Sequence, residues 1–146
     1  MTQIAIVVSR FNKVVSEELL AGALERLKEV GLSEQQISVT KVPGAIEIPL
    51  TAQLLAVTRK YQAIICLGAV ILGETNHYDY VCNQVSEGCQ RVMLDFEIPV
   101  IFGVLTTSTL EQALERVGGK KGHKGKEAAD AAMEMIGVVT NISKNA

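Results

Sequence analysis

The chain has 146 residues, of which 48% are hydrophobic and 21% are charged, and its formal net charge is −2. This length and composition predict one domain over residues 1–146 with a full hydrophobic core, and they exclude an intrinsically disordered chain. The absence of tryptophan, the 4% of aromatic residues and the lack of a basic stripe outside residues 120–126 argue against a nucleic acid as partner.

Nothing in the sequence is typical of secretion or of membrane insertion. The apolar residues 1–8 are too few for a signal peptide with its cleavage site, and no apolar run is long enough to cross a bilayer. Cys66, Cys82 and Cys89 have no C-x-x-C spacing, which favours free thiols that pack as small hydrophobic side chains. Such thiols are typical of a reducing compartment, so we expect a cytoplasmic protein without membrane contact.

Strands and helices alternate along the first part of the chain. Residues 4–8 form a β-branched apolar run, which predicts a strand buried on both faces. The following helix has Ser16 as its expected N-cap and ends before Gly31, where a glycine is favoured. Residues 37–42 predict the second strand. Pro49 then fits the first turn of the next helix, because proline lacks the N–H that has no partner there.

The same alternation continues through the middle of the chain. Residues 63–67 predict a third strand, and the apolar run to which they belong continues to Leu72. Residues 78–96 carry apolar side chains at helical spacing, which predicts a long amphipathic helix. Residues 100–104 predict a fourth strand.

The last part of the chain predicts two helices joined by a loop. Thr109 and Gln112 form a capping-box pattern at the start of a short helix. Residues 118–125 are rich in glycine and lysine and predict a loop, in which His123 is interpreted as a solvated side chain. Residues 127–139 are rich in alanine and predict a helix whose small side chains let a neighbouring element approach closely.

Strands that alternate with helices predict a parallel sheet with helices on both faces, which is an α/β fold of the three-layer α/β/α sandwich type. Right-handed crossovers limit the topology, and we expect a four-stranded sheet in the flavodoxin-like order 2-1-3-4. Ligands of such sheets bind beyond the carboxyl ends of the strands. The expected strand ends are Ser9–Asn12, Pro43–Glu47, Gly68–His77 and Gly103–Thr107.

The third strand end carries the most distinctive chemistry. Residues 68–77 read Gly-Ala-Val-Ile-Leu-Gly-Glu-Thr-Asn-His and lead from a buried strand into a helix. Backbone amides at a helix N-terminus favour a phosphate, which makes Gly73, Glu74 and Thr75 candidates for an anion site. His77 adds a side chain that gives and takes protons near neutral pH. The alternative interpretation is an ordinary strand-to-helix turn with a structural histidine.

Five short motifs occur at these strand ends and after them. They are Ser9-Arg10-Phe11-Asn12, Val42-Pro43-Gly44-Ala45-Ile46-Glu47-Ile48-Pro49, Gly68 to His77 followed by Tyr78-Asp79-Tyr80-Val81, Pro99-Val100-Ile101-Phe102-Gly103-Val104-Leu105-Thr106, and Gly122-His123-Lys124-Gly125. In this order and at this spacing, they make the chain resemble the lumazine synthase family over essentially its whole length.

This resemblance implies a transferase of riboflavin biosynthesis. The family condenses 5-amino-6-(D-ribitylamino)uracil with 3,4-dihydroxy-2-butanone 4-phosphate, releases phosphate and water, and yields 6,7-dimethyl-8-ribityllumazine in the penultimate step of the pathway. The resemblance implies no cofactor and no metal. The sequence agrees with this expectation, because it has no cluster of ligands at metal spacing.

The resemblance also assigns roles to individual residues. It gives ribitylaminouracil binding to Phe11, Ala45, Ile46, Glu47, Val70, Ile71, Phe102 and Lys124, phosphate binding to Gly73, Glu74, Thr75 and Arg116, and catalysis to His77 and Arg116. In these roles Phe11 stacks on the flat heterocycle, Glu47 accepts hydrogen bonds from the ribityl hydroxyls, and Phe102 reaches the ligand from an adjoining subunit. Arg116 supplies the planar donors that a phosphate prefers.

Taken singly, several of these residues have structural explanations. Phe11 is also typical of a lid on a local cluster, and Glu47 of a first-turn carboxylate that complements a helix dipole. Phe102 fits core packing within a strand. Arg116 and Lys124 fit ordinary solvated charges.

The family assembles as homopentamers, and in some members twelve pentamers form an icosahedral shell of sixty subunits. The resemblance therefore implies a homo-oligomer with its active site at the subunit interface, and a riboflavin synthase is a further expected partner. The segment 118–125 has no insertion, as in the shell-forming members, whereas the short start before Ile4 leaves little N-terminal arm for a neighbour. We expect the pentamer.

The sequence departs from the family at Leu72, where an arginine or lysine is usual. The change removes one positive charge beside the candidate phosphate loop, and with it part of the expected attraction for an anionic substrate. A second class of function therefore stays open, namely a non-catalytic protein that binds a flavin or lumazine or forms a shell. A phospho-receiver domain of similar topology is excluded, because no strand ends in an acidic cluster.

Overall fold

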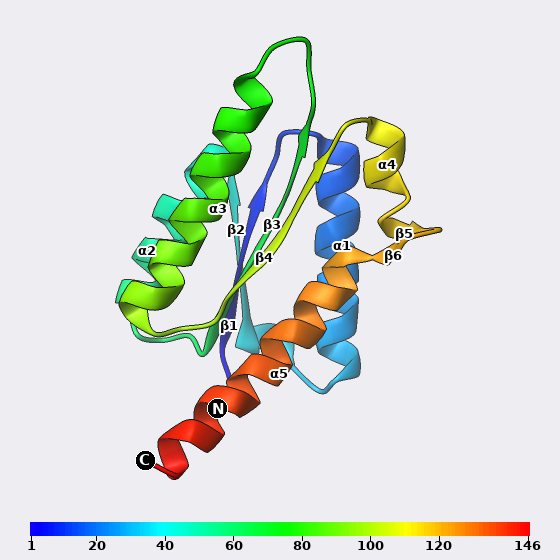
Figure 1. Ribbon diagram of the computed structural model, residues 1–146. Coiled ribbons are helices and arrows are strands. Elements are labelled where there is room, and N and C mark those ends of the chain that lie inside the picture. Colours follow the sequence, from blue (N-terminus) through cyan, green and yellow to red (C-terminus); the bar gives the residue numbers. More distant parts are fainter.

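Four parallel strands form the centre of the protein in a computed structural model that describes residues 1–146. They are β1 (Ile4–Ser9), β2 (Ile37–Val42), β3 (Ala63–Ile71) and β4 (Val100–Thr107). Their order is β2-β1-β3-β4, so the predicted order 2-1-3-4 is confirmed (Figure 1). Ile4 pairs with Ile37 on one side and with Ala63 on the other, and all six residues of β1 are buried.

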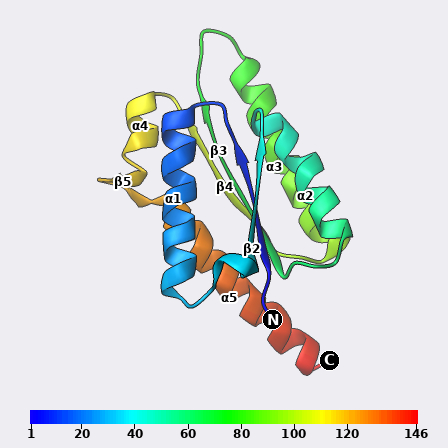
Figure 2. The same cartoon turned by 180° about the vertical axis from the view of Figure 1, so that it is seen from behind.

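Helices cover both faces of this sheet and complete the predicted three layers. The helices are α1 (Lys13–Glu29), α2 (Ile48–Val57), α3 (His77–Phe96), α4 (Leu110–Leu114) and α5 (Lys124–Lys144). Two single 3₁₀ turns, η1 (Glu34–Gln36) and η2 (Ala45–Glu47), precede β2 and α2. Helices α1 and α5 lie on one face and α2 and α3 on the other, while the end of α5 extends beyond the sheet (Figures 1 and 2). None of the helices combines the length and the apolar character that a membrane span requires.

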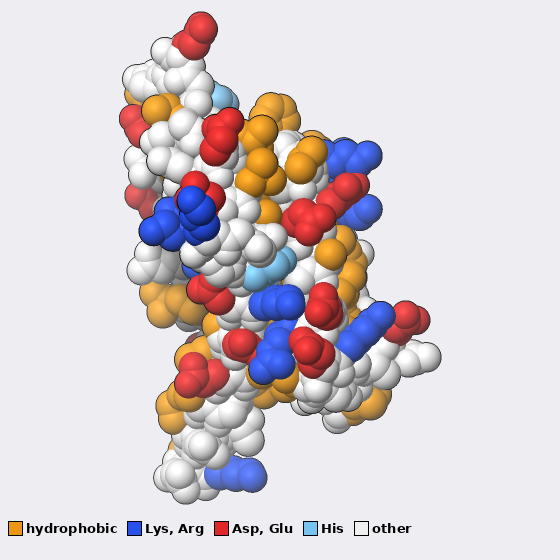
Figure 3. All heavy atoms as spheres, turned by 90° about the vertical axis from the view of Figure 1, so that its right-hand side faces the viewer, with side chains coloured by type: hydrophobic (Ala, Val, Ile, Leu, Met, Phe, Trp, Pro, Cys, Tyr) orange, Lys and Arg blue, Asp and Glu red, His pale blue; other side chains and the backbone are white.

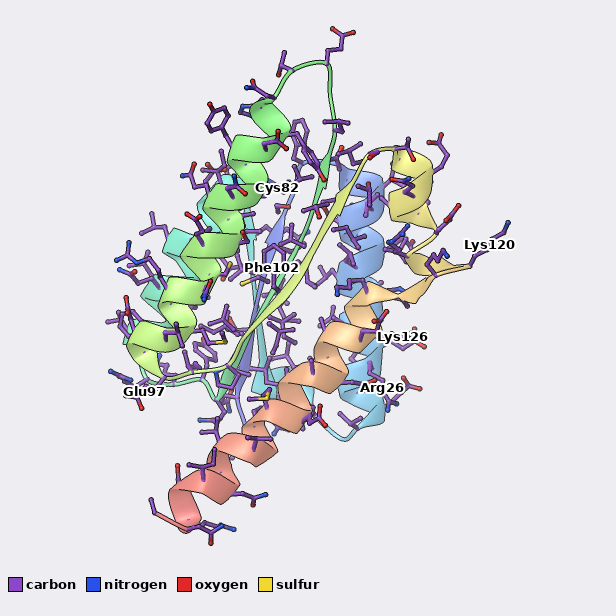
Figure 4. The ribbon with its side chains drawn as sticks, in the orientation of Figure 1. Arg26, Cys82, Glu97, Phe102, Lys120 and Lys126 are labelled. Carbon is purple, nitrogen blue, oxygen red and sulfur yellow. The ribbon has the colours of Figure 1, made fainter.

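The sheet separates two hydrophobic clusters. Ile4 of β1 belongs to the cluster under α1 and α5, whereas the next residue, Ala5, belongs to the cluster under α2 and α3. Three alanines of α5 are buried in the first cluster, which confirms that small side chains let α5 approach its neighbour closely. An exposed ion pair between Arg26 of α1 and Asp130 of α5 also joins these helices, with 2.7 Å between Nε and Oδ1. Figure 4 labels Arg26 on α1 beside α5.

The three cysteines are free thiols. Cys66 and Cys89 are buried in the cluster under α2 and α3, which confirms their interpretation as small hydrophobic side chains. Cys82 is half-buried and packs against the same cluster.

Helix α1 begins four residues earlier than the sequence predicts. Its N-cap is Asn12, in the left-handed conformation with φ 59°, and the side-chain Nδ2 of Asn12 donates to the carbonyl oxygen of Ala69 at 2.9 Å. Ser16 lies inside the helix, is buried, and donates its hydroxyl to the carbonyl oxygen of Phe11. The expected Ser16 cap is therefore wrong, because a contact with a distant strand fixes the turn at Asn12.

Three other helix signals are confirmed. Gly31 has φ 104°, which favours glycine, and its N–H donates to the carbonyl oxygen of Lys28 as α1 ends. Pro49 lies in the first turn of α2. At the start of α4, Thr109 Oγ1 accepts a hydrogen bond from the N–H of Gln112 at 3.1 Å, which confirms the Thr109 cap. The expected capping box forms only in part, because Gln112 Oε1 accepts from the N–H of Ser108 at 2.8 Å and not from that of Thr109.

The predicted boundaries near the site differ from the observed ones. Strands β3 and β4 run to Ile71 and Thr107, past their predicted ends at residues 67 and 104, because residues 68–71 pair with residues 104–107. Most of segment 118–125 belongs to an antiparallel hairpin of β5 (Val117–Gly119) and β6 (Gly122–His123), so the predicted loop is wrong there. Helix α5 starts three residues before the expected residue 127.

Close packing of α5 on α1 gives a testable expectation for stability. A Cβ added at Gly125 would overlap the carbonyl oxygen of Leu19, so Gly125→Ala is expected to lower the free energy of unfolding by about 1–3 kcal/mol. A Cβ added at Gly137, farther along α5, meets no atom, so Gly137→Ala is the matched control. It is expected to raise stability by up to about 1 kcal/mol. Urea unfolding followed by circular dichroism at one protein concentration measures both variants, and equal stability of the two would contradict the expectation.

Candidate functional site

A cavity of about 300 Å³ lies at the carboxyl ends of β1, β2 and β3, beside the start of α3. Parallel strands end at the same edge of a sheet, which brings together residues that are far apart in the sequence. Nine of the predicted site residues line this cavity: Phe11, Ala45, Ile46, Glu47, Val70, Ile71, Gly73, Thr75 and His77. Glu74 is exposed within the same loop and does not line the cavity.

Phe11 lies at this cavity with 70% of its surface exposed. Its N–H donates to the carbonyl oxygen of Pro43 at 3.1 Å, and the side chain of its neighbour Asn12 is bonded to Ala69. The loop after β1 is therefore held to the ends of β2 and β3. The phenyl ring has little packing within the chain, which leaves it available to stack on a flat ligand. Asn12 also lines the cavity and was not among the predicted site residues, although it belongs to the Ser9–Asn12 motif.

Glu47 combines its structural role with an open position. Its Oε1 accepts a hydrogen bond from the N–H of Gly44 at 2.9 Å, which holds the turn before α2. The side chain is exposed and lines the cavity, so the second carboxylate oxygen stays available to accept hydrogen bonds from a ligand. The helix-start explanation and the ligand-binding explanation are therefore compatible.

The segment between β3 and α3 has the features of an anion site. Gly73 and Thr75 line the cavity, and a side chain at Gly73 would meet no atom within 4 Å, which leaves room for a ligand close to the backbone. His77 is the first residue of α3, and its N–H donates to Thr75 Oγ1 at 3.3 Å. The threonine hydroxyl can still donate to an anion, and the positive end of the α3 dipole faces the same place. His77 is exposed, so its imidazole is accessible.

Tyr78 is a cavity residue that sequence reasoning missed, although it directly follows His77. It is half-buried against the cluster under α2 and α3. Burial raises the pKa of the Tyr78 phenol above its ordinary value, so the hydroxyl remains a hydrogen-bond donor at neutral pH. The side chain of Thr106 from β4 lies beside this hydroxyl.

The other three predicted residues line a second cavity of about 400 Å³, at the free edge of β4 and the start of α5. These residues are Phe102, Arg116 and Lys124. The two cavities have no lining residue in common. Phe102 is half-buried at the edge strand, where it also packs against the cluster under α2 and α3 (Figure 4). One chain therefore does not bring all of the predicted residues to one place.

The second cavity is rich in cationic side chains. Arg116 lies two residues after the end of α4 and not on that helix, and its Nη1 donates to the carbonyl oxygen of Gln112 at 2.7 Å. The N–H of Lys124 donates to the carbonyl oxygen of Arg116 at 2.7 Å, which links the main chains of the two cationic residues. Lys121 and Glu127 also line the cavity. Figure 3 shows this side of the molecule, where Lys and Arg side chains lie among Asp and Glu side chains.

Leu72 lies directly after β3, and its N–H donates to the carbonyl oxygen of Thr107 at 2.9 Å. Its side chain is 47% exposed, so an apolar surface occupies the position where the family usually has a cation.

No group of three or more His, Cys, Asp or Glu side chains has the arrangement of a metal site.

Comparison with known proteins indicates the same family as the sequence motifs. The sequence profile of the family described as 6,7-dimethyl-8-ribityllumazine synthase matches residues 1–140. Proteins named 6,7-dimethyl-8-ribityllumazine synthase from Coxiella burnetii strains CbuG_Q212 and RSA 493 / Nine Mile phase I are each 58% identical to the chain over 140 residues. These alignments cover 96% of the chain and 93% of each relative. The chain belongs to the 6,7-dimethyl-8-ribityllumazine synthase family.

Proposed function

We infer that this protein condenses 5-amino-6-(D-ribitylamino)uracil with 3,4-dihydroxy-2-butanone 4-phosphate to give 6,7-dimethyl-8-ribityllumazine. Family membership over nearly the whole chain supports this transferase activity. The observation that carries the inference is the convergence of nine predicted residues on one cavity at the carboxyl edge of the sheet. The free thiols are consistent with a reducing compartment, and we propose a cytoplasmic location.

The first cavity takes the heterocycle and its polyol chain. Phe11 stacks on the flat ring, and Val70 and Ile71 offer main-chain N–H and C=O groups to the polar edge of the pyrimidine. Glu47 accepts hydrogen bonds from the ribityl hydroxyls, with backbone contacts from Ala45 and Ile46. The exposed ring of Phe11 and the open carboxylate oxygen of Glu47 support these roles.

The loop before α3 takes the phosphate of the second substrate. Backbone amides at Gly73 and Thr75 and the Thr75 hydroxyl donate to the phosphate oxygens. Glu74 contributes its backbone, while its carboxylate stays in solvent and away from the anion. Arg116 provides the counter-charge through its planar guanidinium.

A second copy of the chain completes the site. Phe102, Arg116 and Lys124 lie in a different cavity from the other residues, at the free edge of β4, so a neighbouring copy that presents this edge brings both sets together. Exposed apolar side chains at Leu72, Leu110 and Leu114, which lie by the carboxyl end of β4, support burial of this region in an oligomer. We propose a homopentamer, and light scattering separates it from a sixty-subunit shell.

Catalysis in this site depends mainly on alignment. The 5-amino group of one substrate and the ketone of the other form a Schiff base with loss of one water, and phosphate then leaves. The ribityl-bearing nitrogen attacks the remaining carbonyl carbon to close the second ring, with loss of a second water. Holding both partners face to face can supply up to about 7–11 kcal/mol of the acceleration. His77 gives and takes the protons that each step moves.

The activity has a direct optical test. The protein mixed with both substrates is expected to generate the lumazine chromophore faster than the same mixture without protein. The control reaction omits the butanone phosphate. A protein that binds riboflavin or a lumazine but leaves the substrates at the uncatalysed rate would instead be the non-catalytic binding or shell protein.

A further inference from the structure

His123 caps helix α5 next to Lys124 of the second cavity and is not simply a solvated side chain. Its Nδ1 accepts hydrogen bonds from the N–H groups of Gly125 at 3.1 Å and Lys126 at 3.4 Å. His123 is thus the N-cap of α5, and its backbone is extended with φ −133°. A side-chain acceptor at this position satisfies backbone N–H groups that have no partner within the helix.

Glycines leave the space in which this imidazole lies. A Cβ added at Gly22 of α1 would overlap the ring, and one added at Gly125 would lie 3.0 Å from Cε1. A Cβ at Gly118 of β5 would touch the ring at 3.7 Å from Cδ2. The half-buried ring is therefore enclosed by α1, the β5–β6 hairpin and the first turn of α5. The interpretation of His123 as a solvated side chain is therefore wrong. The sequence does not reveal this packing, because Gly22, which leaves room for the ring, lies about a hundred residues earlier in the chain.

The position of this ring is coupled to the two cationic residues of the second cavity. Lys124 directly follows His123, and its N–H donates to the carbonyl oxygen of Arg116. Val117, the residue after Arg116, pairs with His123 across the hairpin. The main chains of Arg116 and Lys124 are thus fixed to each other and to the capped start of α5.

We propose that His123 is a positioning residue for Arg116 and Lys124. Its ring lies in the space that the glycines leave, and from there it caps α5 and holds both cations in place. This inference rests on the proposed function, because that function assigns the two cations to the substrates. The imidazole itself does not line either cavity and does not touch substrate. When the cap is lost, the first turn of α5 frays, and only the fraction of molecules with an ordered turn presents the cations correctly.

The test compares His123→Ala with His123→Asn at varied butanone phosphate concentration. Alanine removes the acceptor, and KM for the butanone phosphate is expected to rise by about tenfold, with kcat within about twofold of the parent. Asparagine is a favourable N-cap, so it is expected to restore KM to within about threefold. An unchanged KM in His123→Ala, or an asparagine variant as impaired as the alanine variant, would overturn the proposal.

Two further variants separate positioning from general damage to the fold. In the Arg116→Ala background, His123→Ala is expected to leave KM for the butanone phosphate nearly unchanged, because the cation that it positions is already absent. If His123→Ala raises KM by the same factor in both backgrounds, the proposal is overturned.

If His123→Ala does not fold, Gly22→Ala displaces the same ring with the histidine intact and is expected to raise KM similarly. A folded Gly22→Ala variant with the KM of the parent would overturn the proposal. Failure of the proposed function is distinguishable, since the parent protein would then form no lumazine.

Discussion

His77→Ala is expected to slow turnover by roughly 10²–10⁴-fold without abolishing it. His77 is an exposed residue at the first position of α3, beside Thr75 in the loop assigned to the phosphate. Its removal takes away the group that moves protons during imine formation, phosphate loss and ring closure. The remaining site still aligns the two substrates, which preserves the contribution of proximity. Initial rates at saturating substrates, read from the lumazine chromophore, measure the effect.

The control for His77→Ala is a measurement that its fold is unchanged. The side chain of His77 is exposed and makes no hydrogen bond of its own within the chain, so the circular dichroism spectrum and the midpoint of thermal unfolding are expected to match the parent. A folded His77→Ala variant with no turnover above the uncatalysed rate would contradict a mechanism dominated by proximity. A rate equal to that of the parent would remove His77 from catalysis.

Arg116→Ala is expected to weaken binding of 3,4-dihydroxy-2-butanone 4-phosphate by roughly 1.5–3 kcal/mol, a factor of about 10 to 150 in Kd. The guanidinium is the counter-charge that we assign to the phosphate, and Leu72 offers no second cation at the loop where the family usually has one. Calorimetric titration with the butanone phosphate measures the loss directly. Affinity for the uncharged ribitylaminouracil is expected to change much less.

Lys120 provides a matched control for the loss of a positive charge. It lies at the tip of the β5–β6 hairpin, where its side chain points away from the rest of the molecule (Figure 4), and it lines neither cavity. Lys120→Ala removes the same charge as Arg116→Ala, yet it is expected to leave the affinity for the butanone phosphate unchanged. Equal losses in both variants would indicate general attraction by the positive surface, and an unaltered Kd in Arg116→Ala would remove Arg116 from the site.

The His77→Ala and Arg116→Ala variants together also test whether the site is shared between copies. His77 and Arg116 line different cavities, and we assign them to one site only through a neighbouring copy. When the two impaired variants are dissociated and reassembled as an equal mixture, about a quarter of the interfaces pair an intact His77 with an intact Arg116. Activity should return on mixing, and a mixture no more active than its components would place both residues in the same chain's site.

The sequence by itself determined the order of elements and the location of the first cavity. Unbroken apolar runs rich in β-branched residues, such as Ile4–Val8, favour burial on both faces, and alternation with helices then favours parallel strands with right-handed crossovers. The carboxyl ends of parallel strands meet at one edge, so residues as distant as Phe11, Glu47 and His77 were predictable neighbours. Local signals such as Gly31 and Pro49 were reliable because their effect depends on the backbone of their own helix end.

Only the tertiary structure decided the features that depend on contacts between distant segments. The N-cap of α1 is Asn12 and not Ser16, because the amide of Asn12 reaches a carbonyl oxygen on β3. His123 caps α5 because Gly22, on another helix, leaves room for its ring. The predicted site is likewise divided between two cavities, because His77 begins α3 after β3, whereas Arg116 follows α4, which comes after the edge strand β4. Such contacts form between groups far apart in the chain, and no local pattern of residue types encodes them.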